Sequence, residues 1–289
     1  MIAPASGVRV IPRDRRDTLG EGAYWSAREG AFYWVDILGR RLNRLSLADD
    51  AVASWEMPDV IGWAIERENT PGFVAGLGRR FVTLTLDPLT IEAIAAPEEA
   101  VEGNRFNDGK ADAQGRIWAG SMPFGCDRPS GSFYRLDPDG RVTRVDTNYT
   151  IPNGPAIPPE GGWLLHTDTA RATIFRYPIH DDGSLGERAP FVKFEKGWGS
   201  PDGMTFDADG GLWVACWGGS CVTRFEPDGR LDRRIALPAS QITNCAFAGD
   251  DLDRMFVTSA ADGVDEADGG ALFEIDPARR GLPTPRWGG

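Results

Sequence analysis

Histidine is nearly absent from this sequence. The chain has 289 residues but only two histidines, His166 and His180, and four cysteines, none of which forms a Cys-x-x-Cys pair. A zinc site built from imidazoles or thiolates, or a catalytic triad that depends on histidine, therefore has almost no residues to draw on. If the protein binds a metal, oxygen ligands must hold it.

Long apolar runs and an excess of basic charge are also missing. No run approaches the roughly 18 apolar residues that a membrane helix needs, and the first residues lack a basic stretch followed by an apolar core. We therefore expect a cytoplasmic protein with reduced cysteines and no membrane partner. The formal net charge of −12 argues against a nucleic-acid partner, because phosphate binding needs a basic surface.

A short pattern recurs along the whole chain: an acidic or polar residue, then a glycine, then an apolar and aromatic strand. Examples are Glu29-Gly30 before Ala31–Val35 and Gly210-Gly211 before Leu212–Val214. The six copies lie 42 to 48 residues apart, as marked by Gly30, Gly72, Gly115, Gly162, Gly210 and Leu252. A period in the forties with several short strands per unit is typical of a propeller blade.

The second half of each unit repeats as well, as an alternating strand that runs into a turn such as Asp137-Pro138-Asp139-Gly140. No stretch has sustained helical periodicity, and the 36 glycines and 21 prolines suit a turn-rich β fold. The sequence predicts one domain over residues 1–289, an all-β, six-bladed β-propeller with four-stranded antiparallel blades. A pair of β-sandwiches is the alternative. The N-terminal segment Val8–Ile11 could complete the last blade and remove an open sheet edge.

Polar residues interrupt this pattern at one equivalent point in four units. Glu21, Asn107, Asn153 and Asp202 each lie eight or nine residues before the glycine of their unit, and each is followed directly or nearly so by another glycine. Any one of them could simply be a turn residue. Equivalent points converge around a propeller axis, however, so four at matched register favour a cage of carboxylate and amide oxygens. Such a cage suits a hard divalent cation.

The motifs at these positions resemble those of the regucalcin/gluconolactonase family. They are Gly-Glu-Gly-x-x-Trp at Gly20–Trp25, Asn-Arg-Phe-Asn-Asp-Gly-Lys at Asn104–Lys110, Asn-Gly-Pro at Asn153–Pro155 and Pro-Asp-Gly-Met at Pro201–Met204. The resemblance extends from about Leu19 to Trp287. It implies a six-bladed propeller and hydrolysis of a sugar-acid lactone with one divalent metal, which could be Ca²⁺, Mg²⁺, Mn²⁺, Zn²⁺ or Fe²⁺.

Carried over residue by residue, the resemblance implies three metal ligands: Glu21, Asn153 and Asp202. It implies substrate contacts for Arg105 and Asn107, and for Asp127, which rests on a variable loop.

A lactone carbonyl needs an electrophile and an activated water. The metal can polarise the carbonyl oxygen. With no usable histidine the general base should be a carboxylate, and Asp202 is the candidate because it can touch both metal and water. We expect a small-molecule sugar lactone as partner and a monomer or weak homodimer. The alternatives are a phosphotriesterase-like hydrolase on the same fold and a non-enzymatic calcium-binding propeller.

Overall fold

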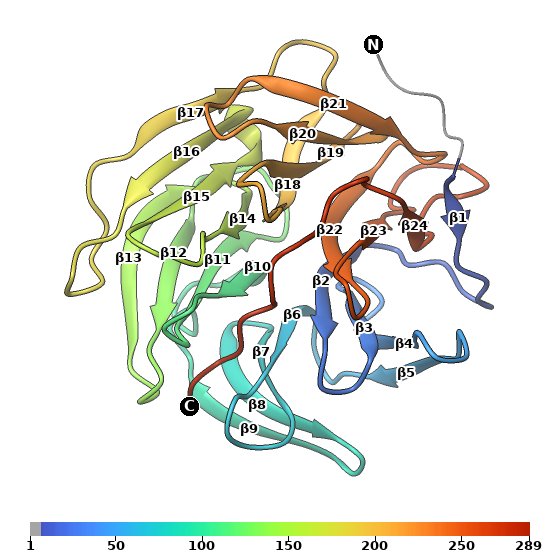
Figure 1. Ribbon diagram of the computed structural model, residues 1–289. Coiled ribbons are helices and arrows are strands. Elements are labelled where there is room, and N and C mark those ends of the chain that lie inside the picture. Colours follow the sequence, from blue (N-terminus) through green and yellow to red (C-terminus); the bar gives the residue numbers. More distant parts are fainter. Residues whose placement is uncertain (1–6) are drawn as a thin grey trace.

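The computed structural model describes residues 7–289, which form six four-stranded antiparallel sheets arranged as a ring (Figure 1). The prediction of a six-bladed propeller with four-stranded blades is confirmed.

Blades 1 to 4 follow one another in chain order from Gly20 onward. Blade 1 has β2 (Gly20–Ser26), β3 (Ala31–Asp36), β4 (Arg41–Ser46) and β5 (Val52–Glu56); blade 2 has β6 (Ile61–Glu66), β7 (Phe73–Leu77), β8 (Arg80–Leu86) and β9 (Leu89–Ala95). Blade 3 has β10 (Asn104–Ala111), β11 (Ile117–Pro123), β12 (Gly131–Leu136) and β13 (Val142–Tyr149); blade 4 has β14 (Pro152–Ala156), β15 (Trp163–Asp168), β16 (Thr173–Pro178) and β17 (Ala189–Lys193), with the 3-10 turn η1 (Thr169–Arg171) after β15.

Blade 5 has β18 (Ser200–Phe206), β19 (Leu212–Trp217), β20 (Cys221–Phe225) and β21 (Leu231–Ala236). Blade 6 combines the two ends of the chain: β22 (Ile242–Ala248), β23 (Arg254–Ser259) and β24 (Phe273–Ile275) are completed on the outside by β1 (Arg9–Val10).

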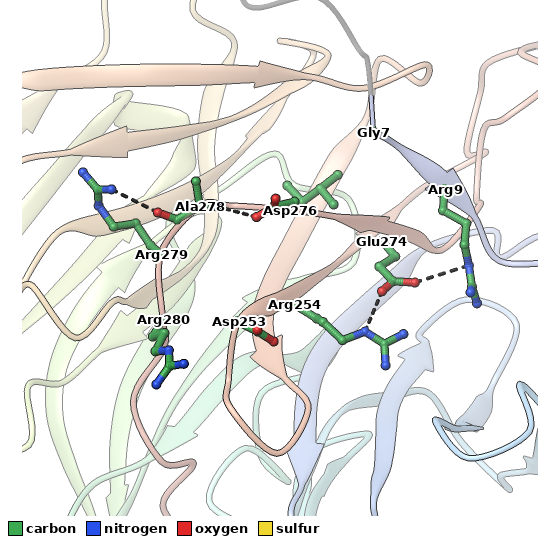
Figure 2. Close-up of a pocket in the computed structure, with 10 residues that line it drawn as sticks. Gly7, Arg9, Asp253, Arg254, Glu274, Asp276, Ala278, Arg279 and Arg280 are labelled. Atoms are coloured by element: carbon green, nitrogen blue, oxygen red, sulfur yellow. Dashed lines mark hydrogen bonds and ion pairs between the residues drawn. The ribbon is translucent and has the colours of Figure 1, made fainter.

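The N-terminal strand closes the ring as the sequence predicted. Arg9 pairs with Glu274 and Val10 with Phe273, and the Ile11 amide donates to the Leu272 carbonyl at 2.9 Å. Figure 2 shows Glu274 between two guanidinium groups, at 3.3 Å from Arg9 and 2.6 Å from Arg254, beside a surface pocket of about 620 Å³. The last sheet therefore has no free edge on β24.

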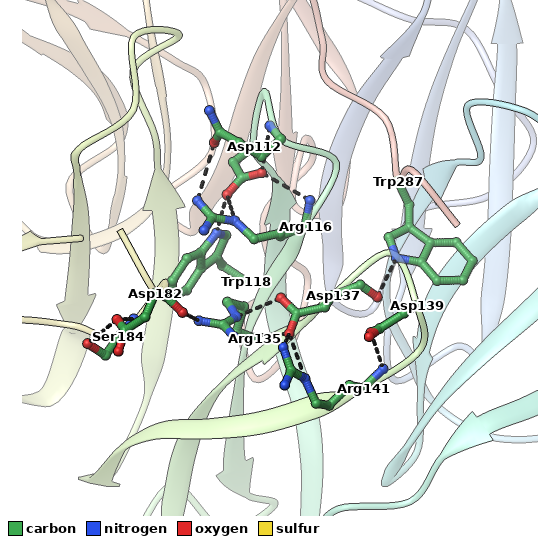
Figure 3. Close-up of polar contacts among 11 residues, drawn as sticks. Asp112, Arg116, Trp118, Arg135, Asp137, Asp139, Arg141, Asp182, Ser184 and Trp287 are labelled. Atoms are coloured by element: carbon green, nitrogen blue, oxygen red, sulfur yellow. Dashed lines mark hydrogen bonds and ion pairs between the residues drawn. The ribbon is translucent and has the colours of Figure 1, made fainter. Parts of the chain in front are cut away.

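The strands of a blade differ in how deeply their side chains are buried. The second strands β3, β7 and β11 are buried at every position, whereas outer strands such as β5 and β9 include exposed positions. Tryptophans on three second strands donate from the indole to a buried aspartate: Trp34 to Asp17 at 2.9 Å, Trp118 to Asp112 at 2.7 Å and Trp213 to Asp207 at 2.9 Å. Figure 3 shows the Asp112 pair with its flanking Arg116. These three tryptophans therefore pack within the blades.

A local irregularity marks every inner strand. The pairing register with the second strand shifts once in each of β2, β6, β10, β14, β18 and β22, which is the mark of a β-bulge. The interpretation of Glu21, Asn153 and Asp202 as turn residues ahead of their strands is wrong, because each lies within an inner strand at or beside the bulge. The extra residue of the bulge interrupts the alternation of inward and outward side chains. In the sequence these strands therefore resemble glycine-rich turns.

The C-terminal segment, residues 278–289, crosses the face of the ring after the last strand. Its Gly281 amide donates to Leu252 in blade 6, whereas the Trp287 amide donates to Glu66 in blade 2 and the Gly288 amide to Gly115 in blade 3. In Figure 1 this dark red segment runs across the ring, and Figure 3 shows Trp287 donating to the Asp137 carbonyl. Behind it lies a chamber of about 900 Å³, lined by the far ends of the inner strands. No helix in residues 7–289 is long or apolar enough to cross a bilayer.

Candidate metal centre

The inner strands place polar side chains together at one end of the channel, near the start of each strand. We call this group the axial site; it comprises Glu21, Arg105, Asn107, Asp108, Asn153, Asp202 and Asn244, from five of the six blades. All seven residues are buried. Blade 2 contributes Gly62 at the same point, where a Cβ atom would collide with the Asn107 carbonyl oxygen.

Three carboxyl groups dominate the electrostatics of the axial site. Burial raises the pKa of Glu21 to about 8, and the charge of Asp108 adds to that shift. Burial also raises the pKa of Asp108, and it raises the pKa of Asp202 well above its ordinary value, together with the charges of Glu21 and Asp108. The charge of Glu21 therefore acts on Asp202, which places the two carboxyl groups within electrostatic reach of each other. Three acids that repel one another in a buried site call for a positive charge between them.

Amide side chains connect the acids across the axis. The Asn244 Nδ2 donates to Glu21 Oε2 at 3.1 Å and to Asp108 Oδ2 at 3.2 Å, so one amide from blade 6 joins blades 1 and 3. On the other side, Asn107 Nδ2 donates to Asn153 Oδ1 at 2.7 Å. The predicted residues Asn107 and Asn153 are therefore in direct contact.

Arg105 is the cation of the axial site. Its Nη1 donates to Asn107 Oδ1 at 2.7 Å and to the Phe106 carbonyl at 3.0 Å, while its Nε is buried without a partner. Burial lowers the pKa of the guanidinium, and the charges of Glu21 and Asp202 oppose that shift, which places those acids within electrostatic reach. A guanidinium with donors to spare, next to buried acids, can orient an oxygen-rich ligand.

Two further aspartates hold the start of the inner strands in place. Asp36 accepts the amides of Thr18 and Leu19, at 3.1 and 3.0 Å, just ahead of Glu21. Asp168 accepts those of Thr150 and Ile151, at 3.2 and 3.0 Å, just ahead of Asn153. The same device therefore fixes two of the predicted ligands.

Thr169 links Asn153 to the strand that carries Asp202, the third predicted ligand. Its hydroxyl accepts from Asn153 Nδ2 at 2.8 Å and donates to the Pro201 carbonyl at 2.7 Å, next to Asp202. The amide nitrogen of Asn153 is thereby held outward, and its Oδ1 is directed toward Asn107.

Asp127 is the one predicted site residue that is not buried. Asp127 lies in the loop between β11 and β12, its side chain is 63% exposed, and it pairs with Arg128 at 3.4 Å. Its role in substrate binding stays a prediction.

Sequence reasoning missed Asp108 and Asn244. Asn244 lies eight residues before the marker Leu252, so its register was visible, but no glycine follows it. Asp108 is next to Asn107 in the same bulge, and the spacing rule selected only Asn107.

The donor set fits a hard cation. Asp202 Oδ1 is buried with no hydrogen-bond partner, and Glu21, Asn153 and Asp202 offer only oxygen atoms. Within residues 7–289 no group of three His, Cys, Asp or Glu side chains is arranged to hold a metal ion. The predicted set has only two such residues, and an amide oxygen supplies its third ligand.

The chain is similar to proteins of one family. A family model described as the SMP-30/Gluconolactonase/LRE-like region matches residues 19–261. The chain is 37% identical to 6-deoxy-6-sulfogluconolactonase from Pseudomonas putida, over 84% of this chain and 83% of the relative. It is 36% identical to a pentonolactonase from Haloferax volcanii, over 96% and 97%.

Solved structures agree in the whole fold. Regucalcin from Agrobacterium tumefaciens, described as a calcium-binding protein, superposes with a TM-score of 0.92 at 27% identity, over 99% of this chain and 98% of that chain. A luciferin-regenerating enzyme gives a TM-score of 0.92 at 27% identity, over 97% and 99%. On the match over residues 19–261, the chain belongs to the SMP-30/gluconolactonase/LRE-like family.

Proposed function

We propose that this protein is a sugar lactonase that hydrolyses an aldonolactone, such as a glucono- or pentonolactone, to the aldonic acid. The observation that carries the proposal is the axial site itself, where buried acids from three blades face an arginine with unused donors. Relatives named as lactonases for sulfogluconolactone, pentonolactone and L-arabinolactone support the same reaction class.

One divalent cation belongs to this proposal, held by Glu21, Asn153 and Asp202. The unpartnered Asp202 oxygen and the crowded acids support it, as does the calcium-binding description of the regucalcin structure. Ca²⁺, Mg²⁺, Mn²⁺, Zn²⁺ and Fe²⁺ are the candidates. Such a cation supplies a Lewis acid for the lactone carbonyl.

The side chains of the axial site then divide the work. Asp202 accepts a proton from a water molecule while the water oxygen attacks the carbonyl carbon of the lactone. When the bond between the carbonyl carbon and the ring oxygen breaks, Asp202 returns that proton to the ring oxygen. The product has one new carboxyl and one new hydroxyl group. Arg105 and Asn107 bind the sugar hydroxyls and fix the orientation of the lactone. The four free cysteines support a cytoplasmic location, which we propose as well.

The test is a reconstitution assay. Protein stripped with a chelator is reloaded with each cation separately and assayed by proton release against pentono- and hexono-lactones, in γ and δ forms, with an organophosphate triester alongside. We expect turnover of at least one aldonolactone that depends on the added cation. Turnover of the triester alone would indicate a phosphotriesterase, and metal binding without any turnover would indicate a non-enzymatic cation-binding propeller.

A further inference from the structure

Few large apolar side chains are exposed on the described part of the chain. Within residues 7–289 they are Leu38, Leu89 and Phe124, with exposed fractions of 37%, 41% and 48%. Isolated surface apolar residues are common and need no explanation by themselves. Phe124 differs from the others because of what it contacts.

Phe124 follows directly on β11, at the end of the ring where the axial site lies. Its aromatic ring packs against the guanidinium of Arg105, with 5.9 Å between the guanidinium carbon and the ring centroid. Arg105 in turn donates to Asn107, which contacts Asn153. One half-exposed aromatic ring is therefore two side chains away from a proposed metal ligand.

The backbone holds Phe124 in a fixed turn. Its amide donates to the Gly103 carbonyl at 2.8 Å, and the Cys126 amide donates back to the Pro123 carbonyl at 3.1 Å. Farther along the loop, Arg128 donates to the Glu102 carbonyl at 3.4 Å. The loop is thus tied to the segment that leads into β10, the strand that carries Arg105.

We propose that Phe124 is a substrate-positioning platform at the mouth of the axial site, on which the C–H face of the sugar lactone packs while Arg105 and Asn107 bind its hydroxyl groups. This inference rests on the proposed function. A lactone ring has one edge rich in oxygen and a face rich in C–H groups, and a guanidinium beside an aromatic ring matches both. The contact is the same before and during the reaction, so it contributes to affinity and leaves the chemical step unchanged.

The experiment compares Phe124→Ala with Phe124→Trp and with Leu89→Ala. Leu89 is a matched control, because it has a similar exposed fraction but lies on the outer strand of blade 2, at the opposite end of the ring. Turnover by the wild-type protein is measured first, and it tests the proposed function by itself. We expect Phe124→Ala to raise KM for aldonolactones by about five- to tenfold with kcat within about twofold, on the scale of one lost apolar contact.

Phe124→Trp should keep KM within about twofold, since it retains an aromatic face, and Leu89→Ala should change neither constant. A small lactone without hydroxyl groups, γ-butyrolactone, serves to separate the platform from the polar contacts. Its KM should rise in Phe124→Ala as well. If the wild type hydrolyses aldonolactones and Phe124→Ala leaves KM unchanged, Phe124 is not a platform for the substrate. A lower kcat at constant KM would show that the ring only supports Arg105.

Discussion

Three acidic side chains, Glu21, Asp108 and Asp202, lie together at the axis. Each carboxyl is buried, and the amide of Asn244 partners only two of them. Asp202 has the least compensation, since its Oδ1 has no hydrogen-bond partner at all. Asp202 is proposed both as a metal ligand and as a general base. A ligand needs only an oxygen atom, whereas a base must accept a proton, so a substitution can separate the two roles.

Asp202→Asn keeps a ligating oxygen and nearly the same shape, but an amide cannot accept a proton at neutral pH. We expect the variant to bind metal more weakly and, at saturating metal, to keep a kcat lower by about 10²-fold or more. Glu21→Gln is the matched control, because it removes a charge from the same cage without touching the proposed base. Steady-state assays across a metal titration would distinguish them. Equal rescue of both variants by excess metal would mean that Asp202 is only a ligand.

His166 has no hydrogen-bond partner for either ring nitrogen and stacks on Phe133 with 3.8 Å between the ring centroids. Burial lowers its pKa to about 3, from 6.5 in an unfolded chain. The unfolded state therefore binds a proton that the folded state refuses between those values, so stability is lost as the pH falls below 6.5. The loss approaches about 1.4 kcal/mol per pH unit.

His166→Phe removes this proton linkage. Urea unfolding at pH 7, 6 and 5 should show a shallower loss of stability for the variant than for the wild type, whatever its stability at pH 7. His180→Gln, at the exposed second histidine, should keep the wild-type slope. Parallel slopes for wild type and His166→Phe would show that His166 becomes protonated without unfolding the protein.

The inner strands show how far the sequence could predict the elements. The second strands of all six blades were visible, because an apolar run follows a glycine in five units and follows Leu252 in the sixth. The inner strands were not, because a bulge adds a residue and interrupts the alternation on which a strand prediction depends. Site residues on regular register, such as Asn153, were nevertheless found, whereas Asp108 depends on the second position of its bulge, which no spacing rule reveals.

Gly62 tests whether the bulges have to fit against one another. A Cβ atom there would collide with the Asn107 carbonyl in the neighbouring blade. Gly62→Ala should cost about 1–3 kcal/mol of stability and shift Asn107, with a loss of lactonase activity. Gly269→Ala is the control, because its Cβ would meet its nearest neighbour at 3.4 Å, an ordinary contact. The comparison comes from the thermal unfolding and the kcat of both variants. Wild-type values for Gly62→Ala would show that blades 2 and 3 can move apart enough to hold the added methyl group.

The whole molecule is braced at the end opposite the axial site. The C-terminal segment joins blades 5 and 6 to blades 2 and 3, with Trp287 buried and Arg286 paired to Glu66 at 3.2 Å. All inner strands run in the same direction, so this segment covers their far ends while the axial site lies near their starts. Stability and chemistry should therefore respond separately to changes in it.

Trp287→Ala should lower stability by about 3–5 kcal/mol, the usual cost of removing a buried tryptophan. At a temperature where the variant stays folded, kcat and KM should be those of the wild type, since the hydrogen bonds of Trp287 join it to Glu66, Glu68 and Asp137, which lie outside the axial site. Differential scanning calorimetry and steady-state kinetics on one preparation would check both. A fall in kcat without a fall in Tm would show that the chamber behind the segment communicates with the site.

The pairing of β1 with β24 has a consequence for how the protein is made. During translation Arg9 and Val10 are made long before their partners Phe273 and Glu274. Asn244, which joins Glu21 to Asp108, also arrives late. Earlier blades can stack as they appear, while β1 stays unpaired until residues 273 and 274 are made. Ring closure is therefore a late step, and a nascent chain stalled before residue 273 should be unable to pair β1 with β24.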